Sequence, residues 1–552
     1  MFQFNKNRIS NSPVFWIIAF MICTAPLSLT YMLHYVDELH YTDAAIQMVQ
    51  SHDFFTPLQA DGEPRFLKPI FTYWMVAGNY ELFGISQFSS RLPFLIFGML
   101  LLFVTYRIAF KLTKNKEISL IALLIAASNP LLILSSSRSI PDLPQALFFA
   151  IGVLGLAGIF VSDQPRNKDL WLFYLGFALA FATKGIPSAV FMLLSVLFLL
   201  FNPWKRTSLK SLINWPAIII GLIVGLWWYI LMYILHGDQF IVSFFADQVS
   251  GRVSENHFRI LKNAAFALLT IAGYFIFWIA PISKLKIKTF FRSPEISQHY
   301  RLFAAITGTW LIAMFVFSVF TVKFYDRYFL PVFPLISVLI AVFLDSTRSR
   351  STDKSLSATN IILQIAGIIV SLISVVIAAR LGNTTTSIVS AILAIMFGLK
   401  IIFLHKNAPL LSETKAISAS ILLTMLSVSM LIGNFARPDQ SMQIAAYLEK
   451  HKPKSQTIVF YGPEKVAAKI RVATRGAITV KCIEPQTPPI ALFDTLIIFR
   501  EDILPDFTSE NYTVSTISSE WKSFPIVPLL FTSDAETVKQ DHLVRHKVIA
   551  IR

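Results

Sequence analysis

Long apolar runs separated by short charged loops are the feature that most limits what this chain can fold into. A helix needs about 20 apolar residues to cross the hydrocarbon core of a bilayer. Hydrophobic residues make up 55% of the 552 positions and charged residues only 14%, a balance foreign to soluble domains. We therefore expect a polytopic α-helical membrane protein with about thirteen transmembrane helices, near residues 13–34, 92–112, 118–137, 143–161, 170–183, 186–202, 216–235, 263–283, 302–320, 328–345, 357–379, 385–404 and 415–433.

The basic residues predict how these spans are oriented. The formal net charge is +16, but the lysines and arginines gather in alternate short loops, which is how cytoplasmic loops are marked. If the N-terminus is cytoplasmic, the inward loops hold Lys111, Lys114, Lys116, Arg166, Lys168, Lys205, Arg206, Lys210, Lys284, Lys286, Lys288, Arg292, Arg301, Arg348, Arg350 and Lys354. An odd number of spans then places everything after Gly433 outside the cytoplasm. This pattern does not describe a nucleic-acid surface, so no nucleic acid is expected as a partner.

Two outward loops are long enough to build a site, residues 34–91 and 236–262. Within the first, residues 40–52 and 70–83 have apolar faces and are too short to cross, which predicts helices lying in the membrane interface. The tail differs, because residues 457–461 and 495–499 are typical of buried strands and residues 441–451 of an amphipathic helix. We predict a transmembrane domain at 1–433 and an extracytoplasmic α/β domain at 434–552.

Three carboxylates on the outward side of the predicted spans are candidates for a site. Asp37 and Glu38 follow the first span, where a carboxylate is costly unless it faces water or a cation. Asp142, in RSIPDLP (138–144), lies at another outward turn, so it and Asp37 can face one site as acid or base candidates. The alternative is that these are helix ends dissolved in headgroup water.

Basic residues on the outward side cannot be explained by orientation. A cavity lined by several of them would suit a phosphate or pyrophosphate, whereas the simpler alternative is binding to ordinary anionic lipid headgroups. The residues concerned are Arg65, Lys68, Arg138, Lys184, Arg252, Arg259, Lys323 and Arg327.

Aromatic and metal-binding candidates are weaker. Tyr325 and Tyr328 can donate to the same phosphate, although tyrosine is also the usual interface anchor. His257 has no second histidine at helical spacing, so we assign no metal site, although a divalent ion with Asp37 or Glu38 stays an open alternative. Neither a nucleotide-binding loop nor a zinc or serine-hydrolase motif is present in a credible context. An activated group used outside the cytoplasm would therefore arrive on a lipid.

Several motifs, taken in order, resemble a known family. Asp37-Glu38 is followed by Tyr41, by RFLKPIFTYW (65–74), by LFG (82–84) and by RLP (91–93). The acid in RSIPDLP, the TKG turn (183–185), the loop with Arg252 and His257, and YFLP (328–331) then follow. This order is similar to that of the GT-C glycosyltransferases related to the lipid A aminoarabinose transferase and, more distantly, to protein O-mannosyltransferases. Thirteen spans with an external α/β tail also fit that layout.

The resemblance implies a sugar donor carried on undecaprenyl phosphate and bound beneath the two interface helices. In the family the first-loop carboxylate, here Asp37, is the catalytic candidate, and the lysine of the KP motif, here Lys68, meets the donor phosphate. Arg252 and Tyr328 match further phosphate partners after a one-residue shift. The chain departs from the family at Leu67, where glutamate is common, and at Ile70, where a second proline is common, which puts the metal seen in relatives in doubt.

The expected reaction is therefore transfer of a sugar, such as 4-amino-4-deoxy-L-arabinose or a related sugar, from undecaprenyl phosphate to lipid A or to another glycan or protein acceptor. Lys68, Arg252 and Arg259 would stabilise the departing phosphate, and Asp37 or Asp142 would deprotonate a hydroxyl acceptor. The alternatives are a protein O-mannosyltransferase-like enzyme, a lipid transporter or flippase, and a non-catalytic assembly protein. The expected location is the inner (plasma) membrane, with the active site and the tail in the periplasm.

Overall fold

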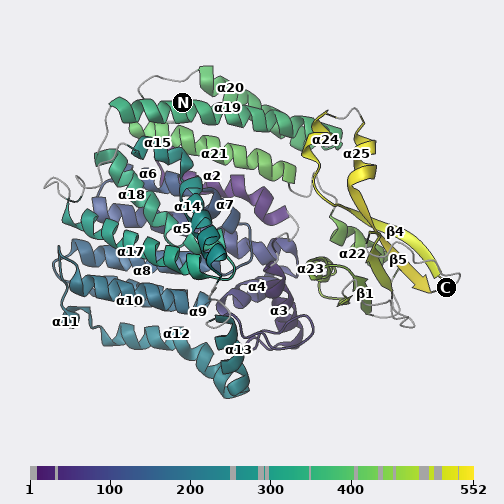
Figure 1. Ribbon diagram of the computed structural model, residues 1–552, viewed down its shortest axis with the longest axis horizontal. Helices are drawn as coiled ribbons and strands as arrows, with labels where there is room; N and C mark the ends of the chain where they lie inside the picture. The colour runs from purple at the N-terminus through teal and green to yellow at the C-terminus, as the bar shows by residue number, and fades with distance from the viewer. Residues whose placement is uncertain are drawn as a thin grey trace, which may run out of the picture.

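The computed structural model describes residues 9–30, 35, 37–248, 256–283, 291, 297–346, 350–402, 408–432, 439–451, 456–483, 496–502, 512–531 and 534–551. A large helical part is followed by a small α/β part, which lies at one end of the molecule (Figure 1). The helical elements are α2 (Pro13–Ala25), η1 (Pro26–Thr30), α3 (Glu38–Ser51), α4 (Phe71–Phe83), α5 (Gln87–Thr113), α6 (Lys116–Ala127), α7 (Pro130–Ser135), α8 (Asp142–Val161), α9 (Asn167–Lys184), α10 (Ile186–Phe201), α11 (Leu209–Leu212), α12 (Trp215–His236), α13 (Asp238–Gln248), α14 (His257–Tyr274), α15 (Ile276–Ile282), α17 (Gln298–Phe320), η3 (Asp326–Phe329), α18 (Phe333–Ser346), α19 (Arg350–Arg380), α20 (Thr384–Ile402) and α21 (Leu410–Ile432).

Eight helices in the described ranges are long and apolar enough to cross a membrane. They are α2 with η1, α5, α8, α12, α17, α19, α20 and α21. The pair α14 and α15, bent by 77° at its break, would make a ninth. The chain is thus a polytopic helical membrane protein, as its sequence predicts, while the count of thirteen spans stays a prediction.

The predicted runs that are not single long helices have identifiable breaks. The run at 118–137 divides into α6 and α7 because Asn129 caps α7, accepting hydrogen bonds from the backbone N–H groups of Leu131 and Leu132. Two other predicted runs contain apolar helices that are short, α10 with 16 residues and α18 with 14. Helix α18 follows η3, a 3₁₀ turn that occupies the start of the predicted run at 328–345.

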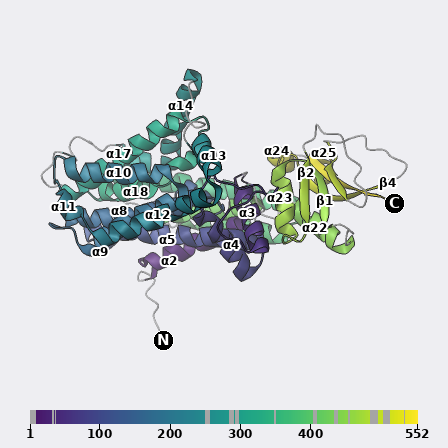
Figure 2. The same cartoon turned by 90° about the horizontal axis from the view of Figure 1, so that it is seen from below.

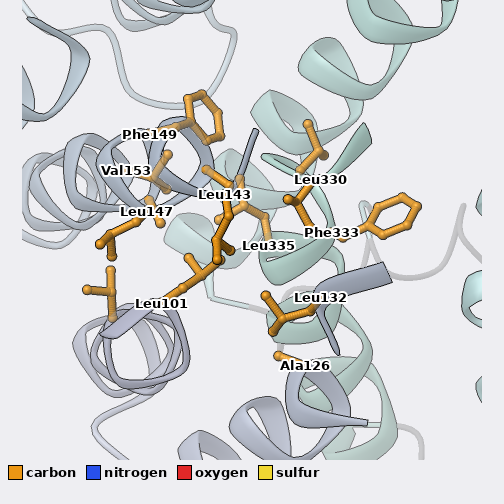
Figure 3. Close-up of a cluster of buried hydrophobic side chains, with 14 of the residues drawn as sticks. Leu101, Ala126, Leu132, Leu143, Leu147, Phe149, Val153, Leu330, Phe333 and Leu335 are labelled. Atoms are coloured by element: carbon orange, nitrogen blue, oxygen red, sulfur yellow. The ribbon is translucent and has the colours of Figure 1, made fainter. Parts of the chain in front are cut away.

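The core of the helical part lies where α5, α6, α7, α8 and the segment from η3 to α18 meet (Figure 3). Aliphatic and phenyl side chains from all of these elements gather there, and each is at most 2% exposed: Leu101, Ala126, Leu132, Leu143, Leu147, Phe149, Val153, Leu330, Phe333 and Leu335. Close packing of this kind fixes the ends of α8 and η3 relative to one another.

The C-terminal part, which we call the C-terminal domain, is a mixed sheet with helices (Figure 2). Its strand order is β2-β1-β3-β5-β4; β1 runs parallel to β2 and β3, whereas β5 is antiparallel to β3 and β4. The elements are α22 (Gln440–His451), β1 (Thr457–Tyr461), α23 (Glu464–Ala473), β2 (Thr479–Ile483), β3 (Ile497–Arg500), β4 (Tyr512–Trp521), α24 (Ile526–Phe531), α25 (Ala535–His542) and β5 (Leu543–Ile551). The two strands and the helix predicted from sequence correspond to β1, β3 and α22.

Candidate functional site

A cavity of about 310 Å³ lies where the first loop meets the starts and ends of several helices. Its wall combines two carboxylates, Asp37 and Asp142, with a surplus of cations and with aromatic rings. The cations are Arg65, Lys68, Lys184, Lys323 and Arg327; the rings are those of His40, Tyr41, Tyr325 and Tyr328. Most of the predicted site residues are therefore gathered in one place.

Helix ends bring the central groups of this cavity together. Asp142 lies in the first turn of α8 and Lys184 is the last residue of α9, so each charge complements its own helix dipole. These two helices pack against each other, and Lys184 Nζ donates to Asp142 Oδ1 at 2.7 Å. Gly185, with φ of +80°, lets the chain reverse directly after that lysine into α10.

Arg327 connects the two carboxylates. It comes from η3 and is 6% exposed, with Nη2 2.5 Å from Asp37 Oδ2 and Nε 3.2 Å from Asp142 Oδ2. Its guanidinium also lies over the rings of Tyr325 and Tyr35, at 4.0 and 4.8 Å from their centroids. Its Nε and Nη1 are buried and have no hydrogen-bond partner among the described residues, so its charge is compensated by the ion pairs and the aromatic rings around it.

The two cavity carboxylates differ in exposure. The side chain of Asp37 is 37% exposed, whereas that of Asp142 is 2% exposed and is held between Lys184 and Arg327. Burial raises the pKa of Asp37, the neighbouring Asp142 raises it further, and the cations Arg65, Lys68 and Lys184 oppose the shift. Asp37 is thus the carboxylate that a ligand in the cavity can contact.

Glu38 does not line this cavity, although it is adjacent to Asp37. It is fully buried and forms a two-pronged ion pair with Arg91, with Nε–Oε1 at 3.0 Å and Nη2–Oε2 at 2.8 Å. The backbone N–H of Ser139 also donates to its Oε1, at 2.9 Å. Glu38 therefore connects α3 to α5 and to the loop before α8. The sequence pattern predicts Glu38 as a site candidate beside Asp37 and does not reveal this structural contact.

The first loop contributes Arg65 and Lys68 through specific contacts. Lys68 Nζ donates to Gln248 Oε1 at 3.0 Å, and the amide of the same glutamine donates to the backbone oxygen of Leu67. Arg65 Nε donates to the hydroxyl of Tyr73, on α4, at 3.2 Å. The last residue of α13 thus holds the lysine of the KP motif at the cavity wall.

A second, mainly apolar hollow adjoins the charged cavity. It shares Lys68, Lys184 and Tyr328 with the charged cavity and continues between α10 and α17 along aliphatic and phenyl side chains. These side chains include Ile186, Val190, Phe191, Met314 and Phe317. Lys184 Nζ lies 5.2 Å from the centroid of the Tyr328 ring at the junction. A charged head and an apolar chain can therefore occupy neighbouring compartments.

The remaining predicted site residues lie elsewhere. Arg259 is exposed on α14 and lines a separate hollow of about 740 Å³ with Lys262 and Lys323. His257, also exposed, is the first residue of that helix and borders neither hollow. Arg252 lies outside the described residues. Among the described residues, the charged cavity and this second hollow share Val322 and Lys323.

Sequence reasoning did not single out His40 as a site residue, although its ring borders the cavity. Burial, and then the charge of Arg65, lower its pKa to about 4, so it is neutral at pH 7. The sequence motif includes Tyr41 without assigning it to the site, and it does not predict that Arg327 bridges two acids. For His40 and Tyr41 a signal is present in the sequence, because they follow Asp37 by three and four residues, the spacing that places helical residues on one face.

The residues do not form a metal site. No group of three histidine, cysteine or acidic side chains within the described part of the chain is arranged to hold an ion. Both cavity carboxylates already contact cationic side chains, which a divalent ion would have to displace. We therefore assign no step to a metal.

Comparison with known proteins agrees with this architecture. The family model described as dolichyl-phosphate-mannose-protein mannosyltransferase matches residues 67–230. The crystal structure of ArnT from Cupriavidus metallidurans bound to undecaprenyl phosphate superposes with a TM-score of 0.70, at 16% identity, over 97% of both chains.

Sequence relatives agree with the structural match. An uncharacterized protein of Aquifex aeolicus (strain VF5) is 26% identical over 58% of this chain, and the aligned part spans 61% of that protein's length. The undecaprenyl phosphate-alpha-4-amino-4-deoxy-L-arabinose arabinosyl transferase 1 of Proteus mirabilis (strain HI4320) is 22% identical over 70% of this chain and 69% of its own.

The fold and the matches define the class: this is a membrane protein with the fold of ArnT, which combines spanning helices, an elaborated first loop and a C-terminal sheet. Its sequence is similar to the undecaprenyl phosphate-alpha-4-amino-4-deoxy-L-arabinose arabinosyl transferases and, over residues 67–230, to the protein mannosyltransferase family model, which confirms the resemblance seen in its motifs.

Proposed function

We propose that the protein is a membrane glycosyltransferase that takes a sugar from a polyprenyl-phosphate donor. The observation that carries the proposal is the cavity with its surplus of cations, joined at Lys68, Lys184 and Tyr328 to an apolar hollow. A polyprenyl phosphate has this division, an anionic head on an apolar chain. Relatives named as undecaprenyl phosphate-alpha-4-amino-4-deoxy-L-arabinose arabinosyl transferases support the same donor class.

The cations would act on the leaving group. As the bond between the anomeric carbon and the phosphate oxygen breaks, negative charge grows on the polyprenyl phosphate. Lys68 and Lys184 stand at the junction of the two hollows, and Arg327 adds a further positive charge to the cavity wall. Fixed donors at a site of developing charge are worth about 3 kcal/mol each where they have been removed from other enzymes.

Asp37 is the residue we assign to the transferred group. Its carboxylate is the more exposed of the two, and Asp142 is already held between two cations. If the acceptor is a hydroxyl, the new bond forms from its oxygen to the anomeric carbon and Asp37 takes its proton. If the acceptor is an ionised phosphate, no base is needed and Asp37 would hold the donor sugar, for instance through an amino group. In either case Asp142 positions Lys184 and Arg327.

The finer assignments form part of this proposal. The sugar is 4-amino-4-deoxy-L-arabinose or a related sugar, and the acceptor is lipid A or another extracytoplasmic glycan or protein. The second basic hollow, with Arg259, Lys262 and Lys323, supports an anionic acceptor, because Lys323 connects it to the donor cavity. The protein would reside in the inner membrane, with the cavity and the C-terminal domain on the periplasmic side.

Mass spectrometry of the lipid A fraction tests this proposal in cells. A deletion strain is complemented with wild type, with Asp37→Asn, or with Glu63→Gln, which changes an exposed carboxylate of the same loop. We expect a pentose or hexosamine mass to be restored by wild type and Glu63→Gln only. An identical lipid A profile in all strains would remove lipid A as the acceptor, and restoration by Asp37→Asn would contradict the assigned residue.

A further inference from the structure

Helix α3 has two faces with different neighbours. His40 and Tyr41, in its first turns, border the cavity, and Asp37 immediately precedes the helix. Farther along, Asp43 and Gln50 contact the C-terminal domain. Helix α23 and the turn after it supply the opposing surface, as Figure 2 shows from below. One short helix therefore lies between the candidate catalytic groups and a domain none of whose described residues lines the cavity.

A buried ion pair joins the two. Arg471, on α23, donates from Nε to Asp43 Oδ1 at 2.9 Å and from Nη2 to Oδ2 at 2.8 Å. The two side chains are 9% and 2% exposed. Arg471 also donates to the backbone oxygen of Val480, at 3.1 Å, and pairs with Glu464. Because the guanidinium of Arg471 is also held by groups of the C-terminal domain, the ion pair fixes the orientation of α3 relative to α23 as well as the distance between them.

A close backbone approach lies beside the ion pair. Gly476 adopts φ of +74°, and its carbonyl oxygen accepts a hydrogen bond from Gln50 Nε2 at 2.7 Å. A Cβ at this position would come within 2.9 Å of that nitrogen and 3.0 Å of Ile46 Cγ2. The left-handed conformation favours glycine here, and a side chain would also crowd Gln50 and Ile46. Asp43, Ile46 and Gln50 thus form a single docking stripe on α3.

We propose that Arg471 is a positioning residue, which holds α3 through Asp43 so that Asp37, His40 and Tyr41 keep their places at the cavity. The cations that face the donor phosphate, Lys68 and Lys184, lie on other elements. Loss of Arg471 should therefore disturb the groups that act on the sugar and the acceptor more than the groups that bind the lipid phosphate. The kinetic part of this inference rests on the proposed glycosyltransferase function, whereas its structural part does not.

Hydrogen exchange of the full-length protein in nanodiscs tests the structural part. Arg471→Gln should raise exchange at least tenfold in residues 38–51, because it leaves the Asp43 carboxylate buried without its partner. The double variant Asp43→Asn with Arg471→Gln should restore much of the protection. Lys465→Ala, which removes an exposed cation from the same helix, is the matched control and should change nothing. Unaltered exchange across α3 in Arg471→Gln would overturn the proposal.

Kinetics with an undecaprenyl-phosphate-sugar donor test the catalytic part. We expect Arg471→Gln to lower kcat at least tenfold while the donor KM changes less than threefold, and Arg471→Lys to recover only part of kcat. Raised exchange in α3 with wild-type kcat would overturn the positioning role. A wild-type protein that transfers no sugar would instead contradict the proposed function, and the exchange result would still decide whether Arg471 holds α3.

Discussion

The buried ion pairs of α3 and the charges lining the cavity differ in charge balance and in exposure, although Asp37 and Glu38 are neighbours in sequence. Outside the cavity, Glu38 and Asp43 each have a two-pronged arginine partner and almost no exposure. In the cavity, two carboxylates face five cations. Matched charges serve structure, whereas a cationic surplus in a hollow is suited to an anionic ligand. The predictions below test this contrast.

The largest effect should come from the exposed carboxylate of the cavity. Asp37→Asn keeps the shape of the side chain but removes its charge and basicity, so we expect turnover to fall on the order of a thousandfold, with little change in thermal stability. Turnover of the purified enzyme and its melting midpoint measure the two effects. A large drop in the midpoint would show that Asp37 belongs with the structural pairs.

The neighbouring residue should show the opposite behaviour. Glu38→Gln leaves Arg91 buried without its counter-charge, at a cost of about 3–5 kcal/mol of folding stability. The melting midpoint in detergent should fall clearly, while Glu81→Gln, an exposed carboxylate on α4, should leave it unchanged. A stable Glu38→Gln variant that has lost its activity would place Glu38 in the chemistry.

Removing one cation of the surplus should weaken donor binding and leave the fold intact. Lys68→Met keeps the apolar stem but loses a charge-assisted contact, so the KM for an undecaprenyl-phosphate-sugar donor should rise about 10- to 100-fold. Lys116→Met, in the predicted cytoplasmic loop, serves as the control. An unchanged donor KM for Lys68→Met would contradict the role of the cavity cations.

The smallest effect should be a shifted acid limb of the pH profile. Burial raises the pKa of Asp37 above its ordinary value, so the ionised form is lost at higher pH than for an exposed aspartate. With Asp37 acting as a base, kcat should fall as pH decreases through that raised pKa and stay level above it. Measuring kcat against pH with a hydroxyl acceptor checks this, and a limb at the pKa of an exposed aspartate would contradict the burial.

The fold was predictable as far as local pattern reaches. Each predicted apolar run contains a helix or a pair of helices, because hydrophobicity and length are local properties. Among the tail elements, β1, β3 and α22 were predicted, whereas β2, β4 and β5 were not, because polar or charged residues interrupt the apolar residues in these three strands. The site was predictable in composition, since cations in the loops predicted to face outward break the orientation rule. Which of Asp37 and Glu38 faces the cavity depends on Arg91 and Arg327, and only the tertiary fold brings these close.

The most direct test of the central claim is to follow both products of one turnover. Purified protein in nanodiscs is given an undecaprenyl-phosphate-sugar donor and a lipid A acceptor, and free undecaprenyl phosphate and sugar-bearing acceptor are counted together. We predict one undecaprenyl phosphate released for each sugar transferred by wild type, and almost none of either by Asp37→Asn. A donor that is bound or moved across the bilayer with its sugar still attached would contradict the account and favour a lipid transporter.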